Sequence, residues 1–372
     1  MLRKLISIST VAAFMLLAAL PLYGMLLPDA DQAVESENRA SAQFPADATL
    51  LEMPAAFEAY FNDHFAFRSE MVELYNGYEY MLRDGGDRVA YGRDGWLFYM
   101  MENSRQDIQR TNPYTVEQME MVAAAQQQAA DELAEMGAAY YLMFCPDKHT
   151  VYPEYLPDDL QVGEGDSHLD TLVKALARTD VAVVDTREAL IAAKSEHQVY
   201  LKTDTHWNGY GAFAGYDALA RRLEAEVPGF RRLRAGDCNF VVAETRRGGD
   251  LAGLVGRANE MAEEWVSVAP RESAVVRLKE LPFEEPSADP NRRSAIYENP
   301  SCPDAPTCVL FRSSFSDAFL PLLCEGFSRT AVVWSEGVVE SVVRAERPDV
   351  VIMEYVERLG GMAINGILRD EA

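Results

Sequence analysis

A regular alternation of short apolar runs with helical segments, beginning near residue 115, constrains the fold of this chain most strongly. A helical stretch that ends at Gly137 precedes the apolar run 139–144, and a second one at 168–178 precedes the run 181–185. Three further runs complete the set, at 307–311, 330–334 and 349–355. Short apolar strands that alternate with helices are typical of a mostly parallel sheet. We therefore predict an α/β sandwich.

Two other regions interrupt this pattern. Residues 228–300 are rich in Arg, Glu and Pro and lack the alternation, which predicts an insertion or a substrate-facing lobe. Residues 28–50 are polar and rich in Ala, Ser and Asp, as expected of a linker. We therefore place one domain at 51–372 after that linker.

The N-terminus predicts a membrane anchor. Arg3 and Lys4 precede an uncharged run from Leu5 to Leu27, which is long enough to cross a bilayer as a helix. Basic residues before such a run keep the N-terminus in the cytoplasm. The run is long for a signal peptide and lacks a clear A-x-A exit, so an uncleaved anchor at 1–27 is favoured over a cleaved signal. In both cases the rest of the chain leaves the cytoplasm.

Net charge limits the classes of partner. Lys and Arg number 34 against 59 Asp and Glu, which gives a formal charge of −25. This balance argues against nucleic-acid binding, because phosphate contacts need clustered basic residues. A local basic groove for an acidic sugar polymer remains compatible with it.

The five cysteines include one pair at loop spacing. Cys302 and Cys308 flank the short Pro-rich stretch PDAPT, which a disulfide closes in an oxidising compartment. The alternative is that all five are small buried apolar residues.

Two segments carry residue types that suit catalysis where strands end and helices begin. One is TDTHWN at 203–208, and the other is VLFRSSFSDAF at 309–319. Acyl transfer to a serine needs a base for the hydroxyl proton and a carboxylate to orient that base. Asp204 and His206 are two residues apart, so in an extended segment both side chains point the same way and pair. The imidazole then reaches a serine from the second segment.

Structural explanations compete with this interpretation. An isolated Asp-x-His is often incidental, and consecutive serines before a helix are often caps. As a metal half-site, Asp204 and His206 need two more ligands, and neither His197 nor Asp185 has ligand spacing. We therefore expect neither a metal nor a cofactor.

Several further motifs extend over most of the chain after the anchor. Together with the two segments above, the set is FNDHFAFR (61–68), GRDGWLFY (92–99), PDKHTVYPEYLP (146–157), YLKTDTHWNGYGAF (200–213), GGDLAGLVG (248–256), FRSSFSDAF (311–319) and RPDVVIMEYVER (347–358). In these motifs and in their order the chain resembles the SGNH-hydrolase-like family of alginate O-acetylation proteins, which modify bacterial exopolysaccharides. This resemblance implies a three-layer α/β/α sandwich of the SGNH-hydrolase type.

The resemblance also implies a set of catalytic residues. The family's Asp-x-His-Trp falls on Asp204, His206 and Trp207, and its nucleophile falls on Ser314. One departure is Ser313, where the family usually has Asp. A hydroxyl still caps a helix, but the local charge is lost.

Five further residues are candidate substrate contacts, each with a structural alternative. Arg312 and Lys148 are candidate partners of substrate groups, and Asn208 either donates to an oxyanion or caps a helix. Trp334 and Tyr152 either stack on sugar rings or pack in the core.

The resulting hypothesis is a periplasmic, membrane-anchored O-acetyltransferase of an exopolysaccharide, with Ser314 as nucleophile, His206 as base and Asp204 as orienting acid. The resemblance implies a multispanning acyltransferase partner that passes acetyl groups across the inner membrane. One alternative is an esterase that removes acetyl groups from a polysaccharide. Another is a non-catalytic glycan-binding scaffold of an export complex, which the Ser313 departure favours.

Overall fold

The computed structural model describes residues 88–368 except 245, 246, 288 and 290, and also 42–46, 51–64 and positions 11, 14, 15, 49 and 71. The predicted anchor (1–27) and linker (28–50) lie largely outside the described residues. No helix within the described part of the chain has the length and apolarity needed to cross a bilayer.

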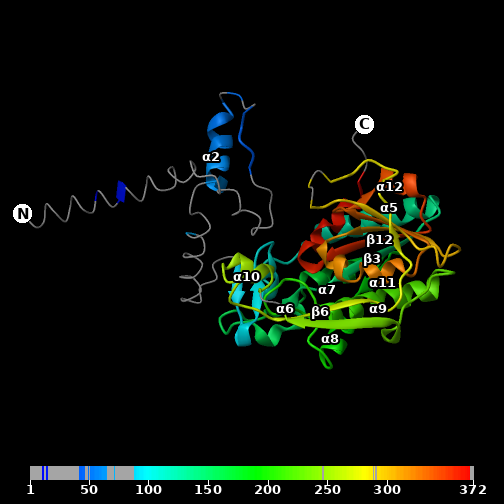
Figure 1. The fold of residues 1–372 in the computed structure, drawn as a ribbon, viewed down its shortest axis with the longest axis horizontal. Coiled ribbons are helices and arrows are strands. Elements are labelled where there is room, and N and C mark those ends of the chain that lie inside the picture. Colours follow the sequence, from blue (N-terminus) through cyan, green and yellow to red (C-terminus); the bar gives the residue numbers. More distant parts are fainter. Residues whose placement is uncertain are drawn as a thin grey trace, which may run out of the picture.

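A seven-stranded sheet forms the centre of the fold, in the order β4-β3-β12-β9-β10-β8-β7 (Figure 1). The first five of these strands are parallel, and β8 and β7 extend the sheet in antiparallel pairs. The predicted α/β fold is therefore confirmed, with a mixed sheet. The strands are β3 (Ala139–Cys145), β4 (Ala182–Asp185), β7 (Val276–Arg277), β8 (Ala295–Glu298), β9 (Thr307–Arg312), β10 (Arg329–Trp334) and β12 (Val350–Val356).

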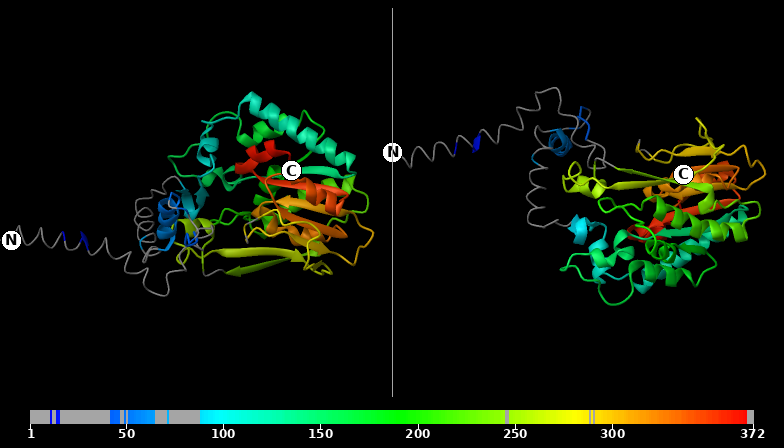
Figure 2. Two further views of the ribbon diagram at one scale, coloured as in Figure 1. Left: turned by 90° about the horizontal axis from the view of Figure 1, so that it is seen from above. Right: turned by 60° about the horizontal axis from the view of Figure 1, so that its bottom comes forward.

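Helices cover both faces of this sheet (Figure 2). One apolar cluster joins the sheet to α5 (Val116–Glu135), α7 (His168–Leu176) and α12 (Glu340–Glu346). The other joins it to α8 (Arg187–Lys194), α9 (Gly209–Glu226) and α11 (Leu320–Cys324). Strands covered on both faces read as continuous apolar runs, and all seven residues of β12 are buried.

Local sequence signals fix the ends of the main helices. Thr115 and Gln118 form a reciprocal capping box at the start of α5, and Ser167 and Asp170 do the same for α7. Gly137 follows α5 with φ of +88°, a conformation that a residue without a side chain adopts readily. These caps explain why the predicted and observed boundaries agree within about two residues.

Smaller elements surround the sheet. A turn at Asp94 and Gly95 has positive φ at both residues and connects β1 to β2 as an antiparallel pair. Segment 228–300 contains the ribbon of β5 and β6, the short α10, and the edge strands β7 and β8 of the main sheet. The remaining helices and short strands are α2 (Met53–His64), β1 (Val89–Tyr91), β2 (Leu97–Tyr99), α4 (Ser104–Gln109), α6 (Lys148–Val151), β5 (Cys238–Glu244), α10 (Asp250–Leu254), β6 (Glu264–Pro270), β11 (Val338–Val339) and β13 (Ile367–Leu368). Single 3-10 turns are η3 (Arg93–Gly95), η4 (Pro153–Tyr155), η5 (Ala235–Asp237), η6 (Ser314–Ala318) and η7 (Glu357–Asn365).

All five cysteines are free and buried, so the predicted disulfide between Cys302 and Cys308 is absent from the structure. Cys308 lies within β9 and belongs to the apolar core, whereas the thiol of Cys302 donates to the carbonyl of Phe327 at 3.5 Å. The two side chains therefore lie in different surroundings. The alternative prediction, that the cysteines are small buried apolar residues, describes them better.

The sheet brings together the chain segments that follow its parallel strands. β12 lies between β3 and β9, and β10 lies on the other side of β9. Parallel strands end at the same edge of a sheet, and ligands bind in open α/β folds beyond that edge. The segments after β3, β9, β10 and β12 are therefore the ones in which to seek a site.

Candidate active site

Ser314 is the first residue of η6, directly after β9. The strand ends at Arg312, and Ser313 caps the turn by accepting the N–H of Phe315 at 3.2 Å. The turn therefore begins within two residues of the end of the strand. Ser314 is half-buried, which leaves its hydroxyl accessible at the edge of the sheet.

Asp204 and His206 lie in a bent loop that leads into α9, not in the extended segment that the sequence suggested. Their pairing arises because one carboxylate oxygen, Oδ1 of Asp204, accepts from both the backbone N–H of His206 (2.9 Å) and its Nδ1 (2.7 Å). Trp207, next in sequence, is buried and donates its indole N–H to the carbonyl of Phe315 at 3.0 Å. This bond joins the histidine loop to the serine turn.

The structure brings the three residues that sequence singled out into one chain of hydrogen bonds. Nε2 of His206 lies 2.7 Å from Oγ of Ser314, and Nδ1 lies 2.7 Å from Oδ1 of Asp204. The serine comes from β9 and the acid–base pair from the loop before α9, 108 residues apart. Hydroxyl, imidazole and carboxylate in this order constitute the arrangement that activates a serine nucleophile.

Electrostatics suits a histidine that accepts a proton. Burial alone lowers the pKa of His206, but the hydrogen bond and charge of Asp204 outweigh it and raise the pKa above its usual value. Burial likewise raises the pKa of Asp204, yet its bonds to His206 dominate and lower it to about 2. Asp204 is therefore ionised at neutral pH and stabilises the imidazolium.

A second carboxylate, which sequence reasoning missed, stands beside the pair. Asp250 lies with its Oδ2 3.7 Å from Nδ1 of His206, and its carboxylate accepts the N–H of Thr205 at 2.7 Å. The backbone N–H of Asp250 donates to Oδ2 of Asp204 at 3.0 Å. A side chain at Gly249 would overlap the Asp204 carboxylate, so α10 approaches the acid closely only because residue 249 is glycine.

Lys148, a predicted substrate contact, has a different role in the structure. Its buried ammonium group donates to the carbonyls of Leu201, Lys202 and Asp204 at 2.7–2.9 Å. Three bonds use all three N–H donors, so none is left for a substrate. Burial lowers the pKa of Lys148 to about 8, and neighbouring carboxylates limit that fall. Lys148 therefore holds the loop that carries Asp204 and His206.

Comparison with known proteins identifies the family of this chain. The family model for the SGNH hydrolase-like domain of the acetyltransferase AlgX matches residues 89–318. The chain belongs to this AlgX family. A relative is the protein named probable alginate O-acetylase AlgJ of Pseudomonas aeruginosa, which is 31% identical over 237 residues, covering 61% of this chain and 56% of that protein. The chain thus spans about half the length of the curated relatives it matches.

Solved structures share the fold of this AlgX-family chain. Bacillus cereus PatB1 has a TM-score of 0.54 at 17% identity, covering 75% of this chain and 99% of that one. A DHHW family protein from Eubacterium siraeum has a TM-score of 0.55 at 13% identity, covering 76% and 100%. At these identities the likeness establishes the fold alone.

Two other predicted substrate contacts of this AlgX-family chain serve its structure instead. Asn208 caps α9, because its Oδ1 accepts the N–H groups of Tyr210 and Gly211 and its Nδ2 donates to a carbonyl. Tyr152 is buried against the ring of Trp96, and its hydroxyl accepts the N–H of Val199.

The remaining two candidates, Arg312 and Trp334, lie together at the ends of neighbouring strands. The strand register pairs Trp334 of β10 with Arg312 of β9. The guanidinium of Arg312 lies 5.1 Å from the Trp334 ring, and that of Arg292 lies 5.0 Å from it. Asp317 forms an ion pair with Arg312 at 2.5 Å. An aromatic ring near two cations, one of which is two residues before Ser314, is a feature suited to an acidic sugar.

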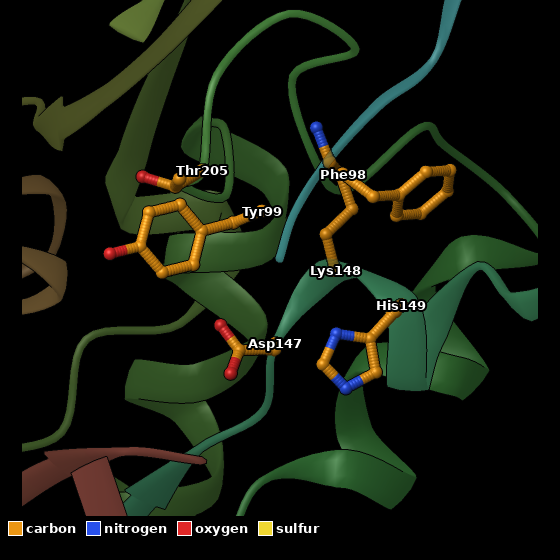
Figure 3. A pocket seen from close by; sticks show the side chains of 6 residues that line it. All are labelled: Phe98, Tyr99, Asp147, Lys148, His149 and Thr205. Carbon is orange, nitrogen blue, oxygen red and sulfur yellow. The ribbon is translucent and has the colours of Figure 1, made fainter. Parts of the chain in front are cut away.

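A small pocket lies beside the histidine loop (Figure 3). Thr205, the residue between Asp204 and His206, lies on one side of it with the ring of Tyr99. Asp147 lies opposite and forms an ion pair with Arg358. The lining consists of Phe98, Tyr99, Asp147, Lys148, His149 and Thr205.

Among the residues that the structure describes, two clusters have ligand atoms close enough for a metal ion. In the first, Asp250 joins Asp204 and His206, but the carboxylates and the imidazole already hold each other and their neighbours by hydrogen bonds. The second is buried and combines Asp107, His149 and Glu357. In this second cluster Arg110 forms an ion pair with Asp107, with its Nη1 3.1 Å from Oδ1 of the carboxylate. This ion pair offsets the charge of Asp107. Hydrogen bonding therefore accounts for the contacts of the first cluster, whereas in the second cluster Nε2 of His149 and Oε1 of Glu357 are buried without a hydrogen-bond partner among the described residues.

The sequence held signals for the residues that we missed. Asp250 lies in the quoted motif GGDLAGLVG, but no local pattern connects it to a histidine 44 positions earlier. The second missed residue is Glu354, whose carboxylate accepts hydrogen bonds from Ser313 and Ser316. It is an acidic residue inside the otherwise apolar run VVIMEYV, which is unusual for a strand buried on both faces. A charge at such a position indicates a specific partner.

Proposed function

We propose that this chain is an O-acetyltransferase of an acidic exopolysaccharide that acts through an acetyl-serine intermediate at Ser314. The observation that carries this proposal is the continuous hydrogen-bonded chain from Ser314 through His206 to Asp204, with both bonds at 2.7 Å. Membership of the AlgX family supports acetyl transfer as the reaction, and the name of the AlgJ relative supports alginate as the polymer.

The residues support the following sequence of steps. Oγ of Ser314 attacks the acetyl carbonyl of the donor while Nε2 of His206 takes the hydroxyl proton, and His206 then returns it to the leaving group. A sugar hydroxyl next attacks the acetyl-serine and gives its proton to His206. The bond between the acetyl carbon and Oγ of Ser314 then breaks, His206 returns the proton to Oγ, and the sugar leaves as its acetyl ester. Asp204 stabilises the imidazolium in both halves, and the backbone N–H of Ser314, at the start of η6, is available for the oxyanion.

Arg312, Trp334 and Arg292 support an acidic acceptor. The two guanidinium groups flank the indole ring at the carboxyl ends of β9 and β10. A uronate residue offers a carboxylate for the cations and a sugar face for the ring. The proposal places this group beside the nucleophile as an acceptor subsite, despite the acidic net charge of the chain.

The periplasm and an N-terminal membrane anchor complete the proposal, and both rest on the sequence run 5–27. In that compartment acetyl groups arrive from a membrane partner, which we propose to be a multispanning acyltransferase. The serine at position 313, where the family usually has Asp, does not favour the non-catalytic scaffold once its hydrogen bonds are considered. Its hydroxyl donates to the carboxylate of Glu354 at 2.9 Å, so a negative charge lies beside the turn after all.

The decisive experiment uses the variant Ser314→Ala with 4-nitrophenyl acetate and a sulfonyl fluoride. We expect the wild-type chain to release nitrophenol and to be labelled at Ser314, and the variant to lose both. The matched control is Ser335→Ala, which removes a serine after the neighbouring strand β10 that bonds only locally to Gly337. Full turnover by Ser314→Ala would overturn the assignment.

A second assay separates transfer from hydrolysis. Oligouronate is added with the acetyl ester, and acetylated oligosaccharide is measured against free acetate. Acceptor-dependent acetylation supports the transferase, whereas acetate release alone supports the esterase alternative. Binding of oligouronate that is unchanged in Ser314→Ala, without labelling of the wild type, would favour the scaffold.

A further inference from the structure

A buried carboxylate lies beneath the serine turn. Glu354 stands near the end of β12 and is 1% exposed. The register pairs Met353 with Phe311 of β9, so Glu354 lies one step further along, where β9 ends. An ionised group inside an apolar sheet is costly unless hydrogen bonds satisfy it.

The serine turn supplies most of those hydrogen bonds. The Glu354 carboxylate accepts from the backbone N–H of Ser313 (2.8 Å), its hydroxyl (2.9 Å) and the hydroxyl of Ser316 (2.8 Å). The thiol of Cys145 at the end of β3 lies near the same carboxylate. The Ser313 hydroxyl accepts the N–H of Phe315, so its own proton is directed to Glu354.

These bonds bracket the nucleophile. Ser313 precedes Ser314 and Ser316 follows it by two residues, and one carboxylate holds both. Charge-assisted bonds are shorter and stronger than neutral ones, so the turn is fixed on both sides of Ser314. The hydrogen bonds of Glu354 go to Ser313 and Ser316 and not to Ser314 or His206, so its effect on those two residues passes through the turn.

We propose that Glu354 is the positioning residue of the nucleophile: its carboxylate fixes the turn so that the Ser314 hydroxyl stays within bonding distance of His206. The same carboxylate supplies, from β12, the negative charge that Ser313 lacks. This inference rests on the proposed role of Ser314 as the nucleophile. It adds a residue that does not touch the reacting atoms.

The variants Glu354→Gln and Glu354→Ala test this inference. A displacement of about 1 Å at a reacting atom costs on the order of 10²-fold in rate, so we expect about that loss in kcat for Glu354→Ala. Glu354→Gln retains one acceptor oxygen, and we expect roughly a tenfold loss. KM for 4-nitrophenyl acetate should stay the same, and sulfonyl labelling of Ser314 should slow in parallel with kcat.

The pH profile separates positioning from a change in the base. Glu354 contacts the serine turn and not the imidazole, so the acid limb of kcat/KM should keep its midpoint in Glu354→Gln. A shift of that limb would overturn positioning through the turn.

A matched control is Glu346→Gln on α12. This carboxylate is also buried, with its side chain 5% exposed, and pairs with Arg329 at 2.7 Å away from the serine turn. We expect this control to lower the thermal midpoint while kcat per folded molecule stays at the wild-type value. If Glu354→Ala does not fold, Ser316→Ala removes a single hydroxyl donor from the same carboxylate, and we expect a several-fold loss of kcat.

Moving the charge provides a rescue test. Ser313→Asp alone places a second carboxylate against Glu354, and repulsion between buried like charges should reduce kcat. In the double variant Ser313→Asp with Glu354→Gln, one carboxylate is restored beside the turn, so kcat should recover above that of either single variant. A loss equal to the product of the single effects would overturn the inference.

The outcomes distinguish this inference from the proposed function. If wild type is labelled at Ser314 and active, and Glu354→Gln has kcat within twofold of it, only the positioning role fails. If wild type is neither labelled nor active, the nucleophile assignment fails, and the positioning role falls with it.

Discussion

Replacement of Asp204 by asparagine should change both the rate and the pH dependence of ester cleavage. Oδ1 of the carboxylate accepts two bonds from His206, and Oδ2 accepts the N–H of Asp250. An amide offers only one acceptor oxygen, so Asp204→Asn must face its NH₂ toward one of these donors. If the NH₂ faces Nδ1, the ring proton moves to Nε2, which then cannot take the proton of Ser314.

The expected magnitude follows from the charges. Two unit charges about 4 Å apart attract by about 4 kcal/mol at an effective dielectric constant of about 20. Loss of that attraction for the imidazolium of the transition state corresponds to roughly a 10³-fold fall in kcat, at about 1.36 kcal/mol per decade. The wrong tautomer raises the loss toward about 10⁴-fold.

The pH profile should move in a defined direction. His206 must be neutral to act as base, so activity is present above its pKa and is lost as pH falls through it. The bond and charge of Asp204 raise the pKa of His206 against the effect of burial. Asp204→Asn removes that contribution, so the acid limb of kcat/KM should shift to lower pH while the plateau falls.

The assay measures kcat/KM for 4-nitrophenyl acetate between about pH 5 and pH 9, with exposed Asp180→Asn as control. Asp250→Asn should cost less than Asp204→Asn, because its carboxylate is 3.7 Å from Nδ1 without a direct bond. The double variant should lose more than the product of the two single losses, since each carboxylate partly replaces the other. A rate for Asp204→Asn within tenfold of wild type, with the acid limb in place, would refute this reasoning.

Three further predictions concern the packing beside Asp204, the pH dependence of stability and the state of the cysteines. Gly249→Ala places a methyl group against the Asp204 carboxylate, so kcat should fall by about tenfold or more at an unchanged fold by circular dichroism, and an unaffected kcat would contradict the close approach. Burial, and after it the charge of Asp147, raises the pKa of Glu357 from about 4.5 in the unfolded chain to about 8 in the folded one. The protonated Glu357 therefore stabilises the fold fully below about pH 4.5, and this contribution is lost as pH rises through about 8. Glu357→Gln should therefore flatten the fall in urea stability across that window, and an equally steep fall in the variant would contradict it. All five thiols should react in denaturant without prior reduction, whereas a disulfide between Cys302 and Cys308 would leave three.

Much of the fold could be read from local sequence. The apolar runs that became β3, β4, β9, β10 and β12 are continuous because each strand is covered on both faces, and burial of a strand requires this locally. Capping boxes and Gly137 likewise act within a few residues. The sequence did not predict that β8 and β7 extend the sheet, because these short strands lie in a segment without a periodic pattern.

The candidate site was predictable in part. Resemblance and the position after a strand pointed to Ser314, and spacing pointed to Asp204 with His206. Residue type alone left the roles of Lys148, Asn208 and Tyr152 open, because an ammonium, an amide or a ring has the same identity whether it faces a ligand or a backbone carbonyl.

The sequence by itself determined which segments become strands and helices, and which side chains are able to take or hold a proton. Only the tertiary structure decided which of them meet. Asp250 reaches Asp204 across 46 residues and Glu354 reaches Ser313 across 41, because β12 pairs with β9 and α10 packs against the histidine loop. The sequence shows directly that residue 313 carries no charge. Only the fold shows that the carboxylate beside it belongs to Glu354 of the neighbouring strand β12.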